Sequence, residues 1–222
     1  MKKNPLSIES TIKDKCSTLE LGYIQCKVKI KNDYADLLQF IESELTILQQ
    51  QIKIEDIAKL PTIQSSRQGY KALGKDPARY RLSAEALLRR VIKGKGLYHI
   101  NNVVDLLNLV SAKSGYSIGG YDADKISGEI QLGVGKKEEP YQAIGRGDLN
   151  IEFLPVFRDE LGAFGSPTSD STRTMVTPQT THFLMIIFNF GKHDNLKDIM
   201  KETSDWYRKF ADAEIIEQNI LG

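Results

Sequence analysis

Cysteine and histidine are scarce in this sequence, and neither is spaced for a metal site. The 222 residues include two cysteines, Cys16 and Cys26, which form no CxxC pair, and three histidines without HxH or HxxxH spacing. Two cysteines are too few for a disulfide framework. Zinc sites and metal hydrolases need closely spaced ligands. We therefore expect reduced cysteines, no metal and no other cofactor.

Long apolar runs are also missing. No stretch approaches the roughly 20 apolar residues that a membrane helix requires, and Met1 to Ser10 lacks the apolar segment of a signal peptide. Charged residues make up 27% and hydrophobic residues 41% of the chain, which is typical of a globular protein with its own core. The sequence predicts a single domain over residues 1–222 that works in the cytoplasm and has no membrane partner.

Nucleotide-binding and serine-hydrolase motifs are absent. Gly133/Gly135 and Gly145/Gly147 form isolated GxG pairs, without the GxGxxG or P-loop continuation that holds phosphates. No GxSxG segment presents a serine nucleophile. We therefore expect no ATP-dependent ligase activity.

Positive charge is concentrated in one stretch. The formal net charge is +1, but residues 67–95 hold nine basic residues against Asp76 and Glu85, a local net charge of +7. Such a cluster indicates an anionic partner if its side chains share one surface. Solvation of a helix face is the alternative, and both interpretations stay open. The candidates for contact with RNA are Arg79, Arg81, Arg89, Arg90, Lys93 and Lys95.

The hydrophobic pattern predicts an α+β fold with a β-rich core. Apolar periodicity predicts helices at Tyr34–Gln51, Ile54–Leu60, Ser83 to the Gly94–Gly96 turn, Asn101–Ser111 and Leu196–Leu221. Leu19–Tyr23 and Val28–Ile30 alternate apolar and polar residues, which predicts two short strands or one interrupted strand. Short apolar runs predict further strands at Ile130–Val134, Ile151–Phe157 and Phe183–Phe190. Turn-forming residues separate the later strands, so we expect sandwich-like mixed sheets with flanking helices.

Three sequence blocks occur in one order between Tyr80 and Asp122. They are RxSxEALLRR, then INxxVDxxNxVS, then a small-residue segment that ends in Tyr121-Asp122. Together they resemble the B3/B4 domain of the phenylalanyl-tRNA synthetase β subunit, and more closely the stand-alone B3/B4 proteins. The resemblance continues through the segment GRGDLNIEFLPVFRDELGAFGSPTSDSTRT and the run HFLMIIF, and it is weakest in residues 1–30 and 191–222. A similar domain occurs in lysidine synthetases.

The resemblance implies a pocket for the charged end of a tRNA. In the synthetases this domain hydrolyses tyrosine wrongly attached to the phenylalanine tRNA. Asp105 and Asn108 match the family's VVDxxN helix, and we expect them to line or brace the pocket. Helix capping and local hydrogen bonding are the alternative for both residues.

Three positions depart from the family's editing arrangement. Gly119 aligns with its pocket histidine, Tyr98 with an arginine, and the editing glutamate falls at Ile186 or Ile187. The resemblance therefore does not carry over tyrosine editing by the family's own groups.

A segment that we call the polar loop, Gly162–Thr174, offers a different set of polar groups. Its hydroxyls, together with Asp170 and Arg173, supply donors and acceptors for a carboxylate, an amine or a ribose. A solvated turn has a similar composition, which is the alternative. Asp170 is the candidate catalytic residue. The predicted pocket residues are Tyr98, Asn102, Asp105, Asn108, Gly119, Tyr121, Asp122, Arg146, Ser166, Thr168, Ser171 and Arg173.

Three functions are consistent with these residues. The first is a module that binds RNA or aminoacyl-tRNA and has no synthetase activity of its own. The second is a hydrolase that removes the amino acid from a mischarged tRNA, with water held by Asp170 or by backbone groups. The third is a domain that binds a free amino acid or another small metabolite. The sequence leaves the oligomeric state open.

Overall fold

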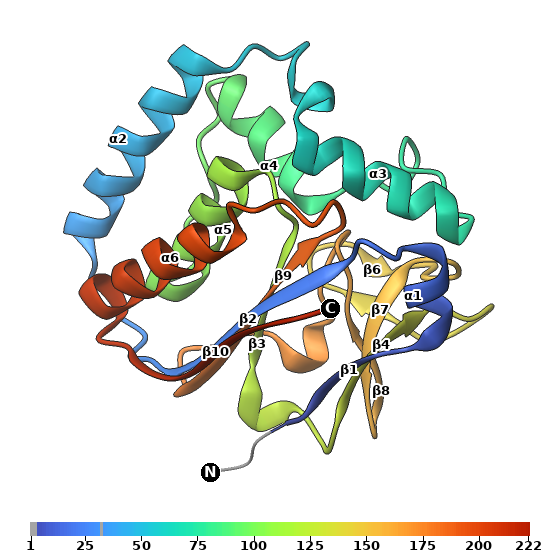
Figure 1. Cartoon of the computed structure of the whole chain (residues 1–222). Coiled ribbons are helices and arrows are strands. Elements are labelled where there is room, and N and C mark those ends of the chain that lie inside the picture. The colour runs from blue at the N-terminus through green and yellow to red at the C-terminus, as the bar shows by residue number, and fades with distance from the viewer. Residues whose placement is uncertain (1–3, 32) are drawn as a thin grey trace.

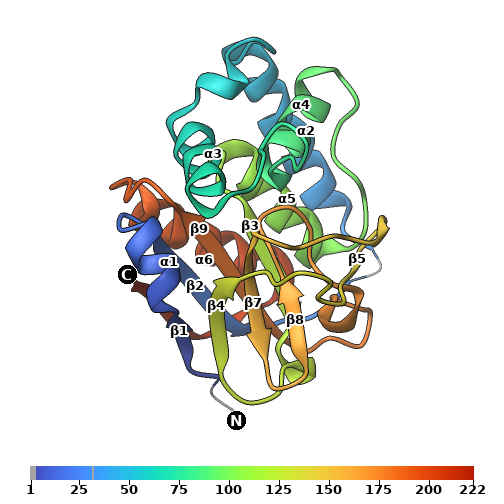
Figure 2. The same cartoon turned by 90° about the vertical axis from the view of Figure 1, so that its right-hand side faces the viewer.

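Two four-stranded sheets pack face to face, and most of the helices cover the outer face of one of them (Figure 1). The structure is a computed structural model that describes residues 4–31 and 33–222. The first three residues of Met1 to Ser10, the segment examined for a signal peptide, lie outside the described residues. Figure 2 shows the same layers from the side, with α2 to α4 above the strands. The predicted α+β fold, with a sandwich-like core and flanking helices, is confirmed.

Six α-helices occur within the described residues. They are α1 (Ser10–Lys15), α2 (Ala35–Gln51), α3 (Pro61–Leu73), α4 (Ser83–Ile92), α5 (Asn102–Ser114) and α6 (Leu196–Ala211). Short 3₁₀ turns lie at η1 (Ile57–Lys59), η2 (Ala123–Lys125) and η3 (Thr172–Thr174).

The first sheet is antiparallel throughout and the second is mixed. The first has the order β10 (Glu214–Leu221), β2 (Glu20–Lys27), β9 (His182–Asn189), β3 (Ile118–Asp122). The second has the order β1 (Leu6–Ile8), β4 (Ile130–Val134), β7 (Pro155–Asp159), β8 (Gly162–Gly165) and contains a parallel β1–β4 pair. A separate hairpin joins β5 (Gln142–Ala143) and β6 (Gly147–Asp148).

Strand β9 is covered on both faces. Phe183, Met185 and Ile187 lie in the core shared with α2, α5 and α6. Leu184 and Ile186 alternate with them and lie in the core between the two sheets. Burial on both faces explains why this strand is a continuous apolar run rather than an alternating one.

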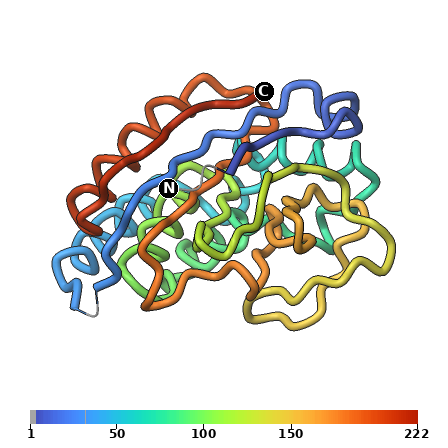
Figure 3. The backbone as a smooth tube through the Cα atoms, turned by 90° about the horizontal axis from the view of Figure 1, so that it is seen from below, coloured from blue at the N-terminus to red at the C-terminus, as the bar shows by residue number. Residues whose placement is uncertain are grey.

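The predicted helix Leu196–Leu221 is wrong in its second half. Helix α6 ends at Ala211, Asp212 takes a left-handed conformation with φ 49°, and Glu214–Leu221 forms β10. Strand β10 pairs antiparallel with β2, and Figure 3 shows it lying beside β2 after the chain turns back from α6. This pairing provides hydrogen-bond partners for the backbone N–H and C=O groups along the edge of β2. The long-range pairing therefore outweighs the local helical pattern of residues 214–221.

Three other predicted elements are displaced. Ile54–Leu60 holds only the turn η1, and the α-helix starts at Pro61, where a helix tolerates the missing N–H. Val28–Ile30 does not continue β2, because its first two N–H groups bond to Thr181 and Ala211 outside the ladder. Of Ile151–Phe157, only the part from Pro155 is a strand, and Phe153 lies in a preceding turn with φ 65°.

No helix of the described residues is long and apolar enough to cross a membrane. Within the same residues, histidine, cysteine, aspartate and glutamate side chains do not gather in groups of three or more that could hold a metal ion. Whether the chain forms a single domain stays a prediction.

Candidate functional site

Asp170 lies where the polar loop meets β3. Tyr121 Oη donates a hydrogen bond to Asp170 Oδ1 at 3.0 Å, and Gly120 N donates to Oδ2 at 3.2 Å. Because β3 is the edge strand of its sheet, the carboxylate binds a backbone N–H that no neighbouring strand reaches. Asp170 is partly exposed as a residue, but its carboxyl group is turned into the protein and is buried. The site therefore presents one carboxyl group in a fixed position.

Two glycines make room for this arrangement. A Cβ on Gly119 or on Gly165 would fall on the hydroxyl oxygen of Tyr121. The ring of Tyr121 is fully buried and packs edge-to-face on Phe164, with 5.0 Å between ring centroids. Gly119 therefore contributes space for a tyrosine hydroxyl at the position where the family has a histidine.

The three segments that the sequence predicts to form a pocket are neighbours around β3. The side chain of Leu107, on α5, occupies the space that a Cβ on Gly120 would need, and the polar loop reaches the same glycine through Asp170. The structure thus brings α5, β3 and the polar loop together. That they enclose a ligand pocket stays a prediction.

Burial raises the pKa of the Asp170 carboxyl from 3.8 to about 7, although hydrogen bonds from Gly120 N and Tyr121 Oη favour the ionised form. The unfolded chain loses this proton near pH 3.8, whereas the folded chain keeps it up to about pH 7. The folded state binds more protons across this range. Its free energy of unfolding therefore falls as the pH rises from about 4 to about 7.

We expect the substitution Asp170→Asn to remove this pH dependence, because the amide does not titrate. The free energy of unfolding of the wild type, relative to the variant, should fall by about 2–3 kcal/mol between about pH 5 and about pH 8. Urea unfolding of both proteins at the two pH values measures the difference. If wild type and variant differed by the same free energy of unfolding at both pH values, Asp170 would not titrate in this range.

Three of the six hydroxyl groups of the polar loop form hydrogen bonds within the described residues, whereas the buried Thr174 Oγ1 has no partner there. Ser166 Oγ accepts a hydrogen bond from Thr168 N at 3.3 Å, and Thr168 Oγ1 lies 2.8 Å from Tyr70 Oη. Ser171 Oγ accepts from Arg173 N at 3.2 Å. Ser166, Thr168 and Ser171 are all buried. These bonds shape the turn that carries Asp170.

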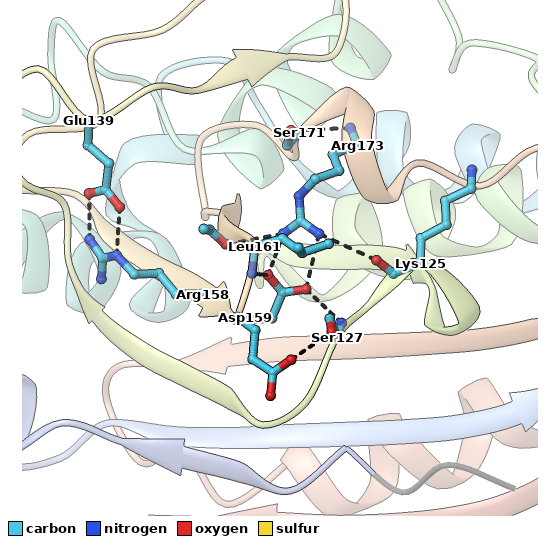
Figure 4. Close-up of polar contacts among 10 residues, drawn as sticks. Lys125, Ser127, Glu139, Arg158, Asp159, Leu161, Ser171 and Arg173 are labelled. Atoms are coloured by element: carbon cyan, nitrogen blue, oxygen red, sulfur yellow. Dashed lines mark hydrogen bonds and ion pairs between the residues drawn. The ribbon is translucent and has the colours of Figure 1, made fainter.

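Arg173 anchors the end of the polar loop to β7 (Figure 4). Its guanidinium donates to both carboxylate oxygens of Asp159, at 2.7 and 3.0 Å, and to the backbone oxygens of Lys125 and Gly162. The side chain of Asp159 is fully buried. Because its donors are engaged in these bonds, Arg173 serves the loop's structure in this conformation.

Two residues of the family's asparagine-bearing helix also bond to backbone groups. Asp105 is fully buried and accepts a hydrogen bond from Ile100 N at 2.8 Å. The Asn102 side chain is fully buried as well, and it bonds to backbone atoms of Lys29, Lys31 and Phe210. These contacts brace the start of α5, and a role of Asp105 in the pocket stays a prediction.

The remaining predicted pocket residues are more dispersed. Asn108 is partly exposed and, within the described part of the chain, has no side-chain hydrogen bond. Tyr98 is 55% exposed in the loop before α5. Asp122 is buried and accepts a hydrogen bond from Thr180 Oγ1 at 2.8 Å. Arg146 is exposed in the turn between β5 and β6.

Several cations of the basic stretch are engaged within the protein. Lys75 is buried, and its Nζ donates to two backbone oxygens. Glu85, which is 3% exposed, pairs with Arg89 at 3.0 Å and lies 3.5 Å from a guanidinium nitrogen of Arg67. The guanidinium of Arg90 lies 4.0 Å from the centre of the Tyr98 ring.

Four of the predicted RNA-contact residues are exposed. They form no ion pair within the described residues, and they are Arg79, Arg81, Lys93 and Lys95. Arg81 lies two residues before Ser83, whose N–H donates to Pro167 O in the polar loop at 2.8 Å. The exposed cations at the start of α4 are thereby attached to the loop that carries Asp170.

Sequence reasoning missed two tyrosines that hold the polar loop. Tyr70, on α3, reaches Thr168, and Tyr141 Oη donates to Ser169 O at 2.7 Å. Both side chains are buried, and burial raises the pKa of both hydroxyls well above its ordinary value. Their partners lie far along the chain, and the residues next to each tyrosine are polar or turn-forming, so no local pattern indicated these contacts.

The sequence and fold of this chain are similar to those of one known domain family. A family model described as the B3/4 domain matches residues 65–220. No curated protein matches the chain. Among solved structures, an N-terminal fragment of the phenylalanyl-tRNA synthetase β subunit from Pyrococcus horikoshii is similar, with a TM-score of 0.51 and 12% sequence identity. The match covers 100% of this chain and 55% of that one. At this identity the likeness shows the fold alone.

Proposed function

Because the chain belongs to the B3/B4 domain family, we propose that it binds RNA, and in particular the aminoacylated 3′ end of a tRNA, without synthetase activity of its own. One observation supports the proposal above the others. The hydrogen bond from Ser83 N to Pro167 O joins the exposed cations before α4 to the polar loop and Asp170. Groups suited to a phosphate backbone and groups suited to its charged end therefore lie on connected segments.

The exposed cations would supply most of the affinity. Phosphates of RNA are bound mainly by arginine and lysine, which release counterions from the nucleic acid. Arg79, Arg81, Lys93 and Lys95 flank α4 on both sides and are free of ion pairs among the described residues. Arg89 has a different role, because it neutralises the buried Glu85.

The polar loop would supply recognition of the attached amino acid. The amino group of an aminoacyl ester is a hydrogen-bond donor, and Asp170 offers a carboxyl group fixed by Tyr121 and Gly120. Its raised pKa of about 7 means that the carboxylate and the acid are both populated at neutral pH. We expect this module to work in the cytoplasm, where charged tRNA is used.

A hydrolase is the second candidate, and the pKa of Asp170 favours it. A general base is most effective when its pKa lies near the working pH, and that of Asp170 is about 7. Ester hydrolysis also needs donors that stabilise the oxyanion. Gly120 N and Tyr121 Oη already donate to Asp170, so they are not free for an oxyanion while the carboxyl holds them.

The two candidates differ in the fate of the ester. We expect the protein to bind an aminoacylated tRNA at low salt. The aminoacyl ester should then be lost no faster than by spontaneous hydrolysis in the absence of the protein. Measuring bound tRNA and remaining ester in the same samples separates the possibilities. Binding with rapid loss of the ester would support the hydrolase, and the Asp170→Asn variant would then show whether this carboxyl activates the water. No binding of any tRNA would contradict both.

A further inference from the structure

A second place in the fold carries unassigned polar groups. A cavity of about 200 Å³ lies between the two sheets, at the side formed by β1, β2 and β10. Its lining includes Asn4, Tyr23, Gln25 and Glu217 among apolar side chains, and it shares no residue with the Asp170 site. The cavity is therefore separate from the site of the proposed function.

Two amide groups of this lining lack partners. Gln25, on β2, is only 7% exposed, and its carboxamide has no hydrogen bond to any described residue. Asn4 Oδ1 is buried and unpaired over the same residues. A buried polar atom without a partner is costly to a folded protein, and Asn4 Oδ1 is such an atom, whereas the Gln25 amide keeps some contact with solvent. Two amides without hydrogen-bond partners beside a cavity can bind a ligand that supplies the missing hydrogen bonds.

The rest of the cavity limits what such a ligand can be. Leu6, Ile130, Leu184 and Ile186 give it apolar walls. The polar pair at its edge is already joined, because Tyr23 Oη donates to Glu217 Oε1 at 2.6 Å. The neutral amides offer C=O acceptors and N–H₂ donors but no charge. An anionic ligand would lose its hydration here without gaining a counterion, because the charged side chain named in the lining, Glu217, is itself acidic.

We propose that this cavity binds a small, uncharged, planar molecule with an amide-type edge, in which a hydrogen-bond donor and an acceptor are adjacent on an aromatic ring. Gln25 would pair with both groups of that edge, as glutamine side chains do with the edge of a nucleobase. Asn4 Oδ1 would accept a further donor, and the ring would contact the apolar walls. Two sources carry this chemistry, a free nucleobase and an aromatic carboxamide.

Binding of adenine, nicotinamide and nicotinate distinguishes these possibilities. Nicotinate differs from nicotinamide in having a carboxylate in place of the amide. We expect adenine, nicotinamide or both to shift the NMR signals of the Gln25 side-chain N–H₂, and nicotinate to leave them unchanged. The response shows which source fits. No response to either at about 10 mM, which would nearly saturate a site with a Kd of about 1 mM, would overturn the proposal, as would an equal response to nicotinate.

Substitution of Gln25 gives a second test. Gln25→Met keeps a long side chain and removes the amide, so binding of the responding probe should weaken about tenfold. Because the amide has no partner in the protein, the variant without ligand should be as stable as the wild type or more stable. Gln131→Met makes the same change on the exposed surface of β4 and should alter neither property. Unchanged binding, or marked destabilisation by Gln25→Met, would contradict the assignment.

Discussion

A variant with Arg79, Arg81, Lys93 and Lys95 all changed to glutamate should bind tRNA about 100- to 1,000-fold more weakly than the wild type at low salt. Each of these cations is exposed and free of ion pairs among the described residues, so its replacement removes a phosphate contact rather than a bond within the protein. The dependence of log affinity on log salt should become shallower by about 1 for each phosphate that the variant no longer binds. Electrophoretic or fluorescence titration over a range of salt concentrations measures both effects.

The control for this variant changes charge elsewhere. Lys13, Lys15, Lys197 and Lys201 are exposed lysines on α1 and α6, and their replacement by glutamate alters the net charge equally. We expect a much smaller loss of affinity from the control. Arg89 is left unchanged in both proteins, because its reversal would place two like charges next to each other at the buried Glu85. Equal losses in the two variants would mean that tRNA responds to overall charge and not to this surface.

Replacement of Asp159 by alanine should lower the free energy of unfolding by about 3–5 kcal/mol. The fully buried Asp159 carboxylate accepts two hydrogen bonds from Arg173 and one each from Ser127 N and Leu161 N. Its removal leaves a partly buried guanidinium and two N–H groups without their acceptor. Urea unfolding at neutral pH measures the loss.

Asp205→Ala provides the comparison for Asp159→Ala. Asp205 pairs with Arg208 on α6, and both side chains are more than half exposed. A pair of this kind contributes less than about 1 kcal/mol, because water and salt screen it. If Asp159→Ala were no more destabilising than Asp205→Ala, Arg173 would not depend on Asp159, and its donors would be free to serve a ligand.

Elements with a strong local pattern were predictable from the sequence. Helix α2 follows from apolar residues spaced by three and four, and β9 follows from an unbroken apolar run. Strand β10 did not follow, because Ile215 and its neighbours become a strand only by pairing with β2, almost 200 residues earlier in the chain. Helix α3 does not follow from the apolar pattern, because Pro61 is compatible both with the end of the preceding segment and with the first position of a new helix.

The candidate site was predictable in its location more than in its contacts. The motif blocks indicate α5 and the Gly119–Asp122 segment, the composition of Gly162–Thr174 indicates the polar loop, and the structure makes these segments neighbours. The partners of Arg173 and Asn102 lie on other elements, so the sequence could not show that both side chains bond within the protein. Similarly, the role of Gly119 depends on the position of the Tyr121 hydroxyl.

The affinity of the wild-type protein for one tRNA, measured with and without its amino acid attached, tests the central proposal most directly. The cations near α4 would contact the tRNA with or without its amino acid. Asp170 would contact the amino group, which is present only in the aminoacylated tRNA. We expect both forms to bind at low salt, with the charged form about tenfold tighter, the equivalent of one charge-assisted hydrogen bond. Equal affinity for the two forms would contradict recognition of the charged end, and no binding at low salt would contradict the proposed function as a whole.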